Sequence, residues 1–164
     1  MSAVDTKKAT RRNIRFEDCS SILADLDRLE SAEKAGTLTR HGNWTLGQIT
    51  HHLADLIEQS IDGFRFSAPA PIRMIFRLLR PMILGRPFPT GIKLKGQSAT
   101  LLPAPDITSE QGLAALRTQI QRLEEGAEMN EPSPLFGRLT HAQWMDLHRR
   151  HAELHLGFLD PGEA

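Results

Sequence analysis

The sequence is almost without cysteine and entirely without tyrosine: Cys19 is the single cysteine among 164 residues. An intramolecular disulfide is therefore excluded, and a lone thiol suits the reducing cytoplasm, which is the expected location. The opening residues are polar and basic, and they lack the apolar segment of a signal peptide. No run of about 18 apolar residues occurs, so no membrane-spanning helix is expected.

The chain also lacks a net charge, because acidic and basic side chains balance at a formal +0. That balance removes the electrostatic signature of nucleic-acid-binding proteins, so no nucleic-acid partner is expected. The length fits one domain with its own core. What the chain does have is seven histidines, four of them between His141 and His155.

Periodic apolar residues predict four long helices with clear start signals. The first helix is expected over residues 18–34, with Asp18 as its N-cap and Gly36 as its stop. Each of the other three begins with a T-x-x-Q capping box, and the last is expected to run to about residue 159. The pairs are Thr45 with Gln48, Thr108 with Gln111, and Thr140 with Gln143. The pattern predicts an all-α domain over residues 14–164, an antiparallel four-helix bundle, after a disordered arm over residues 1–13.

A short amphipathic helix over residues 71–84 and a long loop over residues 85–105 are expected between the second and third long helices. Pro81 should kink or end this helix, and the loop is rich in glycine and proline. Arg73, Arg77 and Arg80 share one side of it, and apolar residues fill the rest. Three alternatives follow: an ordinary packed surface helix, a lid whose arginines meet an anionic substrate, or an interfacial helix. The neutral charge and Pro81 weigh against the membrane alternative.

The histidines of the last helix form a row on one face. On a helical wheel His141 and His155 lie about 20° from His148, and His151 lies about 60° away. Trp144 shares this sector, whereas Asp146 and Glu153 are expected on the opposite face. His151 and His155 are four residues apart, so their Cβ atoms should lie roughly 5–6 Å from each other. Two imidazoles at that spacing can bind one metal ion.

The second long helix offers a third imidazole, and the wheel predicts that it is His52. His52 flanks the apolar face of this helix, whereas His51 lies nearly opposite that face and should meet solvent. Three neutral imidazoles would leave a coordination position open for water or substrate. His148 could close the site as a fourth ligand or act beside it as an acid–base residue. Zinc, nickel and ferrous iron all accept imidazole, and core histidines without any metal are the alternative.

Two motifs resemble the DinB-like superfamily of bacterial helical bundles, in a branch known as a domain of unknown function. NWTLGQITHHLADLIE, residues 43–58, is similar to the second helix of that superfamily, and HAELHLG, residues 151–157, to its closing H-x-x-x-H-x-G. The resemblance implies a metal held by His52, His151 and His155. It also implies thiol-dependent transferases or isomerases that use a low-molecular-weight thiol, and bundles that commonly form homodimers. The sequence departs at Phe158, where relatives often carry glutamine, so the contact of that glutamine is not expected here.

Three hypotheses follow for function. The first is a metal-dependent transferase or hydrolase acting on a small molecule, with His148 as the acid–base residue. The second is a non-catalytic metal-binding or stress-response bundle. The third is a metal-free interaction domain whose histidines are structural and whose basic 71–84 segment contacts a partner.

Overall fold

The computed structural model describes residues 4–84, 86–91 and 102–162, and within them the fold is almost entirely helical. Five helices and two short strands follow one another along this part of the chain. They are α1 (Cys19–Ala35), β1 (Thr39–Arg40), α2 (Leu46–Asp62), α3 (Ala70–Leu84), α4 (Ser109–Glu124), α5 (His141–Leu156) and β2 (Leu159–Asp160). The all-α class is confirmed. The strands pair antiparallel, with Thr39 opposite Asp160, a small sheet that the sequence did not predict.

The predicted start signals of the four long helices are confirmed. Asp18 caps α1, and the αL conformation of Gly36 ends that helix. At the start of α2 the Thr45 hydroxyl accepts a hydrogen bond from the Gln48 backbone N–H at 3.2 Å, and the Gln48 side chain accepts one from Thr45 N–H at 2.9 Å. The same reciprocal bonds open α4 and α5. Each box satisfies two N–H groups that a helix start leaves without intrahelical partners.

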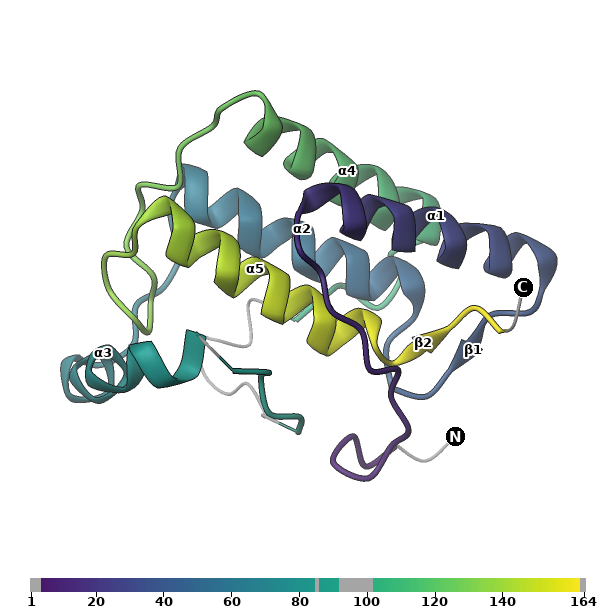
Figure 1. Ribbon diagram of the computed structural model, residues 1–164, viewed down its shortest axis with the longest axis horizontal. Coiled ribbons are helices and arrows are strands. Elements are labelled where there is room, and N and C mark those ends of the chain that lie inside the picture. The colour runs from purple at the N-terminus through teal and green to yellow at the C-terminus, as the bar shows by residue number, and fades with distance from the viewer. Residues whose placement is uncertain (1–3, 85, 92–101, 163–164) are drawn as a thin grey trace.

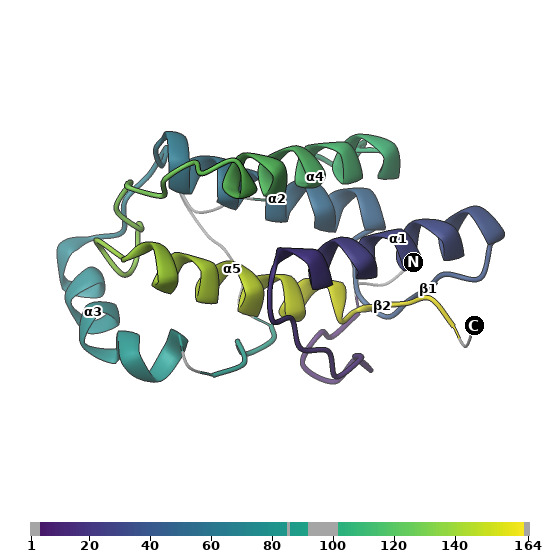
Figure 2. The same cartoon turned by 45° about the horizontal axis from the view of Figure 1, so that its top comes forward.

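The helices pack around one apolar core. Figures 1 and 2 show α1, α2, α4 and α5 extending along roughly the same direction, with α3 at one end of the molecule. The tightest pairing is between α2 and α4, and α5 contacts α1, α2 and α3. Side chains from all four long helices are fully buried, among them Leu26, Leu29, Leu46, Leu116, Trp144 and Leu156. This packing brings the inner faces of α2 and α5 together.

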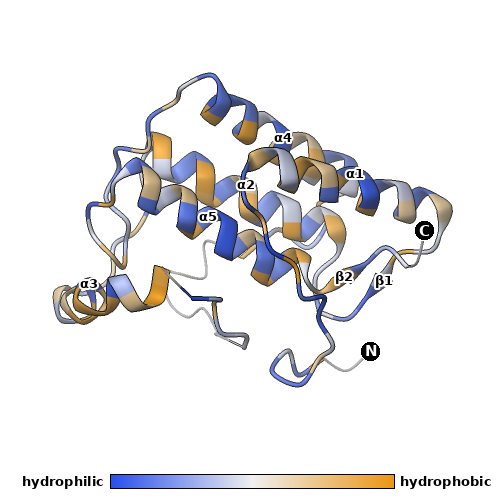
Figure 3. Ribbon diagram, viewed as in Figure 1, coloured by the Kyte–Doolittle hydropathy of each residue, from blue (hydrophilic) through white to orange (hydrophobic). Residues whose placement is uncertain are grey.

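The segment between α2 and α4 differs in part from the expectation. α3 begins at Ala70 and continues through Pro81 to Leu84, so the proline does not end the helix. Figure 3 shows that α3 is rich in apolar residues. Six of them are exposed: Ile72, Met74, Ile75, Leu78, Leu79 and Met82. The expected loop over residues 85–105 lies partly outside the described residues, and residues 86–91 and 102–105 contain no helix or strand.

The last helix is shorter than expected. α5 ends at Leu156, because the chain turns at residues 157–158 and enters β2. The division into a 1–13 arm and a 14–164 domain stays a prediction, but residues 4–13 make specific contacts with the helices that are described below. Within the described residues, no helix combines the length and apolar character that a bilayer crossing requires.

Candidate metal centre

Two helices bring three imidazoles together. His52 is buried on the inner face of α2, and His151 and His155 are half-buried one turn apart on α5. One ring nitrogen from each lies within 4.8 Å of the corresponding nitrogen of the other two. The ring centroids are 4.6 to 4.8 Å apart. The structure therefore unites imidazoles that stand about a hundred residues apart in the chain.

The spacing of these nitrogens fits a single metal ion. His52 Nε2 lies 3.1 Å from His151 Nε2. Two nitrogens bound tetrahedrally to zinc at about 2.0–2.1 Å would lie roughly 3.3 Å apart, so this pair needs little movement to share an ion. In the absence of an ion, one neutral ring can donate an N–H hydrogen bond to the other. Among the described residues, no fourth histidine, cysteine or carboxylate joins the group, so its three nitrogens would leave coordination positions open.

The surroundings keep the imidazoles of α5 neutral. Burial lowers the pKa of His151 well below 6.5, and the nearby His155, His52 and His148 lower it further. Burial also lowers the pKa of His155, with additional contributions from His52 and the positive charge of Arg11. A neutral imidazole keeps the lone pair that a metal requires, because metal ions bind the deprotonated ligand. His151 and His155 are therefore in a ligand-competent form at neutral pH.

Trp44 forms an aromatic wall of the cluster. Its ring stacks on His155 with centroids 5.2 Å apart and planes 12° from parallel, and it meets His52 edge-on at 5.0 Å. Sequence reasoning did not place Trp44 at the site. Its position directly before the Thr45 cap, eight residues or about two helix turns before His52, was the available signal, since the capped start of α2 fixes this side chain beside the helix.

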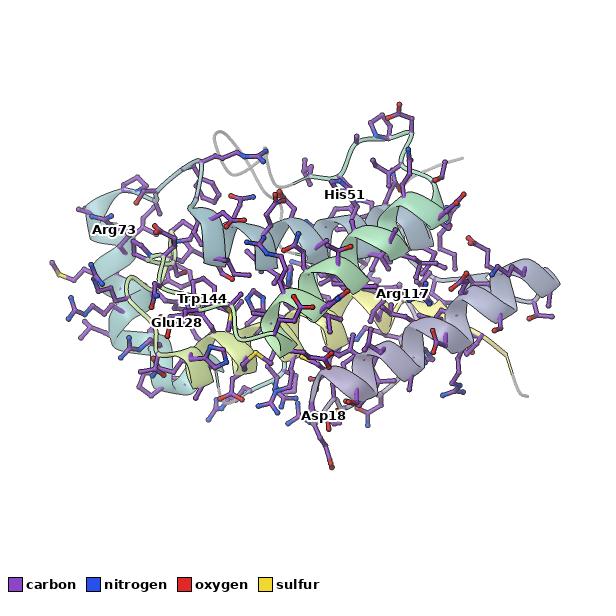
Figure 4. The ribbon with its side chains drawn as sticks, turned by 90° about the horizontal axis from the view of Figure 1, so that it is seen from above. Asp18, His51, Arg73, Arg117, Glu128 and Trp144 are labelled. Carbon is purple, nitrogen blue, oxygen red and sulfur yellow. The ribbon has the colours of Figure 1, made fainter. Side chains whose placement is uncertain are left out.

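The other histidines lie outside the cluster. His148 is buried, and its Nε2 is 3.1 Å from Ser60 Oγ, while its ring stacks on Trp144 at 5.4 Å. Figure 4 shows Trp144 among the helices and His51 at the outer edge of α2. His51 is half-buried and is not among the three clustered rings. His52, and not His51, is the cluster member on α2, as the helical wheel predicts.

Glu153 corrects one sequence expectation. It was placed on the outer face of α5, but it is buried. Its carboxylate accepts a hydrogen bond from the backbone N–H of Phe16 at 2.9 Å and pairs with Arg150 and Arg15. The segment leading into α1 covers this face of α5, so Glu153 faces protein in place of solvent.

A hollow of about 530 Å³ lies away from the histidine cluster, beside the starts of α1 and α5. Cys19, His141 and Arg149 are among its lining residues, and none of the three clustered histidines is. Burial raises the pKa of the Cys19 thiol, and Glu124 and Asp18 raise it further. A protonated thiol is a poor nucleophile. The chemistry-bearing residues therefore point to the histidine cluster and not to this hollow.

A family model described as "Protein of unknown function (DUF1569)" matches residues 8–162. No curated protein and no solved structure matches the chain. The match spans the three clustered histidines, Trp44 and residues 8–18 of the segment that precedes α1.

Proposed function

The chain belongs to the DUF1569 family, and we propose that it binds a divalent metal ion and acts as a metal-dependent transferase or hydrolase on a small molecule. One observation carries the proposal: His52, His151 and His155 present ring nitrogens within 4.8 Å of one another and no fourth protein ligand joins them among the described residues. Structural metal sites are normally closed by four protein ligands, whereas catalytic sites keep a position open.

We also propose that the chain shares the helix arrangement and metal ligands of the DinB-like superfamily that it resembles. In that superfamily the expected arrangement is an antiparallel four-helix bundle, with one ligand from the second helix and two from the last. α2 and α5 would be those two helices. By the same resemblance, the nucleophile would be a low-molecular-weight thiol, and water would serve in a hydrolase. When bound, a divalent ion lowers the pKa of a coordinated water or thiol so that hydroxide or thiolate is available near neutral pH.

The residues of the chain have distinct roles in this proposal. His52, His151 and His155 hold the ion, for which zinc, nickel and ferrous iron stay alternatives. Trp44 supports His155 by stacking on its ring. His148 was expected to transfer protons, but burial lowers its pKa to about 3, with a smaller contribution from His141. An acid–base residue works best with a pKa near the working pH, so the position of His148 favours a role in holding α5 against Ser60 of α2.

Elemental analysis of untagged protein tests metal binding. We expect about one divalent ion per chain in the wild type and loss of most of it in His52→Ala, His151→Ala and His155→Ala, because two imidazoles bind far more weakly than three. His51→Ala is the matched control, since it removes the neighbouring imidazole on the same helix without touching the cluster. Metal-free wild type under metal-replete expression, or equal loss in His51→Ala, would contradict the proposal.

A non-catalytic metal-binding role is the second candidate, favoured by the burial of the cluster and its packing on Trp44. Assays of the metal-loaded protein with a panel of electrophiles, in water and with several thiols, separate the two. Turnover that disappears in His155→Ala supports the enzyme. Metal binding without turnover on any member of the panel supports sequestration.

A further inference from the structure

The N-terminal segment is fixed against the end of α5 by Arg12. The backbone N–H of Arg12 donates to Gly157 O at 2.8 Å. Its guanidinium makes two bonds of 2.8 Å to the Asp25 carboxylate and further bonds to the carbonyls of Leu156 and Leu159. Closer to the N-terminus, the Val4 N–H donates to Asn43 Oδ1 and the Val4 carbonyl accepts from Asn43 Nδ2. Arg11, which precedes Arg12 in the chain, is thereby held against the end of α5.

Arg11 lies along the last residues of α5. A Cβ at Gly157 would come within 2.7 Å of Arg11 Cγ, so the glycine makes room for the arginine stem. The Arg11 guanidinium sits 5.9 Å from the centre of the Phe158 ring. Gly157 caps α5 two residues after His155, so the Arg11 stem lies against the end of the helix that carries this imidazole. Phe158, which replaces the glutamine expected from the resemblance, thus supports this arginine.

The guanidinium is incompletely bonded. Arg11 Nη1 is buried and has no hydrogen-bond partner. A buried donor without a partner costs free energy, and more so when it carries charge. The guanidinium of Arg12, in contrast, is already bonded to Asp25 and to backbone carbonyls, so it has less capacity to bind a ligand. A buried cationic donor at the end of the helix that carries His155 is suited to an anionic ligand.

We propose that Arg11 binds the carboxylate of a small-molecule substrate or co-substrate whose other end reaches the histidine cluster. This inference rests on the proposed function, since the second end would meet the metal held there. A carboxylate is favoured over a phosphate because a single guanidinium is available, and its planar fork matches the two oxygens of a carboxylate. The ligand class is therefore a small monocarboxylate with a metal-binding group, such as a thiol, a few bonds away.

Cobalt-loaded protein provides a test that does not depend on turnover. It would be titrated with 3-mercaptopropionate and with the neutral 3-mercaptopropanol, and binding followed by the cobalt–thiolate charge-transfer absorbance. We expect the wild type to bind the carboxylate-bearing thiol more tightly. Arg11→Gln should weaken 3-mercaptopropionate by about tenfold to a hundredfold and leave 3-mercaptopropanol unchanged. Arg11→Lys should restore part of the preference, because it keeps the charge and loses the fork.

The control variant is Arg15→Gln, which removes the same charge from an exposed arginine of the same segment. Equal weakening of both thiols by Arg11→Gln, or the same loss in Arg15→Gln, would overturn the inference. If cobalt does not bind at all, the proposed function fails, and Arg11 is then judged by NMR of the metal-free protein. A shift of the Arg11 Nε–H signal on addition of propionate supports carboxylate binding, and the absence of any shift overturns it.

Discussion

At the scale of single residues, burial decides the protonation state of His148. Its ring is stacked on Trp144, its Nε2 faces the Ser60 hydroxyl, and its side chain is 5% exposed. Burial lowers its pKa to about 3, since a charged imidazole would lose its hydration without gaining an acidic partner. His148 therefore stays neutral in the folded protein at pH values where an exposed histidine would be protonated.

This difference predicts acid sensitivity of the metal-free protein. Between pH 6.5 and about 3 the unfolded chain binds a proton at His148 that the folded chain excludes, so stability falls as the pH falls. The loss from this residue should reach about 2 kcal/mol at pH 5. Urea unfolding at pH 7.5 and 5.0 measures it. In His148→Gln the loss between these two pH values should shrink by about that amount, and an unchanged pH dependence would contradict the assignment.

At the scale of helices, two glycines set the distance between α2 and α4. A Cβ at Gly112 would lie 2.2 Å from the carbonyl oxygen of Gly47, and a Cβ at Gly47 would lie 2.4 Å from that of Thr108. Neither glycine needs a positive φ, so close backbone approach is the reason for both. This approach fixes α2, and with it His52, relative to the rest of the core.

Gly112→Ala should destabilise the protein by about 3 kcal/mol, because the added methyl has to push α4 away from the α2 backbone. Thermal and urea unfolding measure the change. Thr118→Ala, on the exposed face of the same helix, is the control and should alter stability by less than about 0.5 kcal/mol. Equal stability of Gly112→Ala and the wild type would show that the two helices are not in backbone contact.

At the scale of the whole molecule, the N-terminal segment connects elements that are distant in sequence. In Figure 1 the purple segment crosses the end of α5 before it enters α1. Arg12 makes this connection through the Asp25 carboxylate of α1 and the backbone of residues 156–159. The Arg12 and Asp25 side chains are only 15% and 7% exposed. Loss of one partner would leave the other charge buried and unpaired.

Arg12→Met should therefore cost about 3 kcal/mol of stability, since it keeps most of the side-chain volume but leaves the Asp25 carboxylate buried without its ion-pair partner. Arg15→Met is the comparison, because the Arg15 side chain is 54% exposed and surface ion pairs contribute about 0–1 kcal/mol. Chemical unfolding gives both values. Arg12→Met should also loosen the N-terminal segment, which limited proteolysis within residues 4–12 would detect. Similar stabilities for the two variants would contradict the anchoring role.

The sequence by itself determined the helices, their starts and the candidate ligands. Capping boxes at Thr45, Thr108 and Thr140 are local chemistry between residues three apart, and helical spacing is a local property that selects His52 over His51 and pairs His151 with His155. These features depend on neighbours in the chain, so they can be predicted from it.

Only the tertiary structure decided which of these groups meet and what surrounds them. The nitrogens of His52 and His151 lie 3.1 Å apart because α2 and α5 pack together. Arg11 lies against Gly157 at the end of α5 because Arg12 fixes the N-terminal segment to both α1 and α5. Glu153 is buried, and His148 stands apart from the cluster, because other segments cover those faces of α5. Such contacts join residues separated by up to about a hundred and fifty positions, so they cannot be predicted from the periodicity of the sequence.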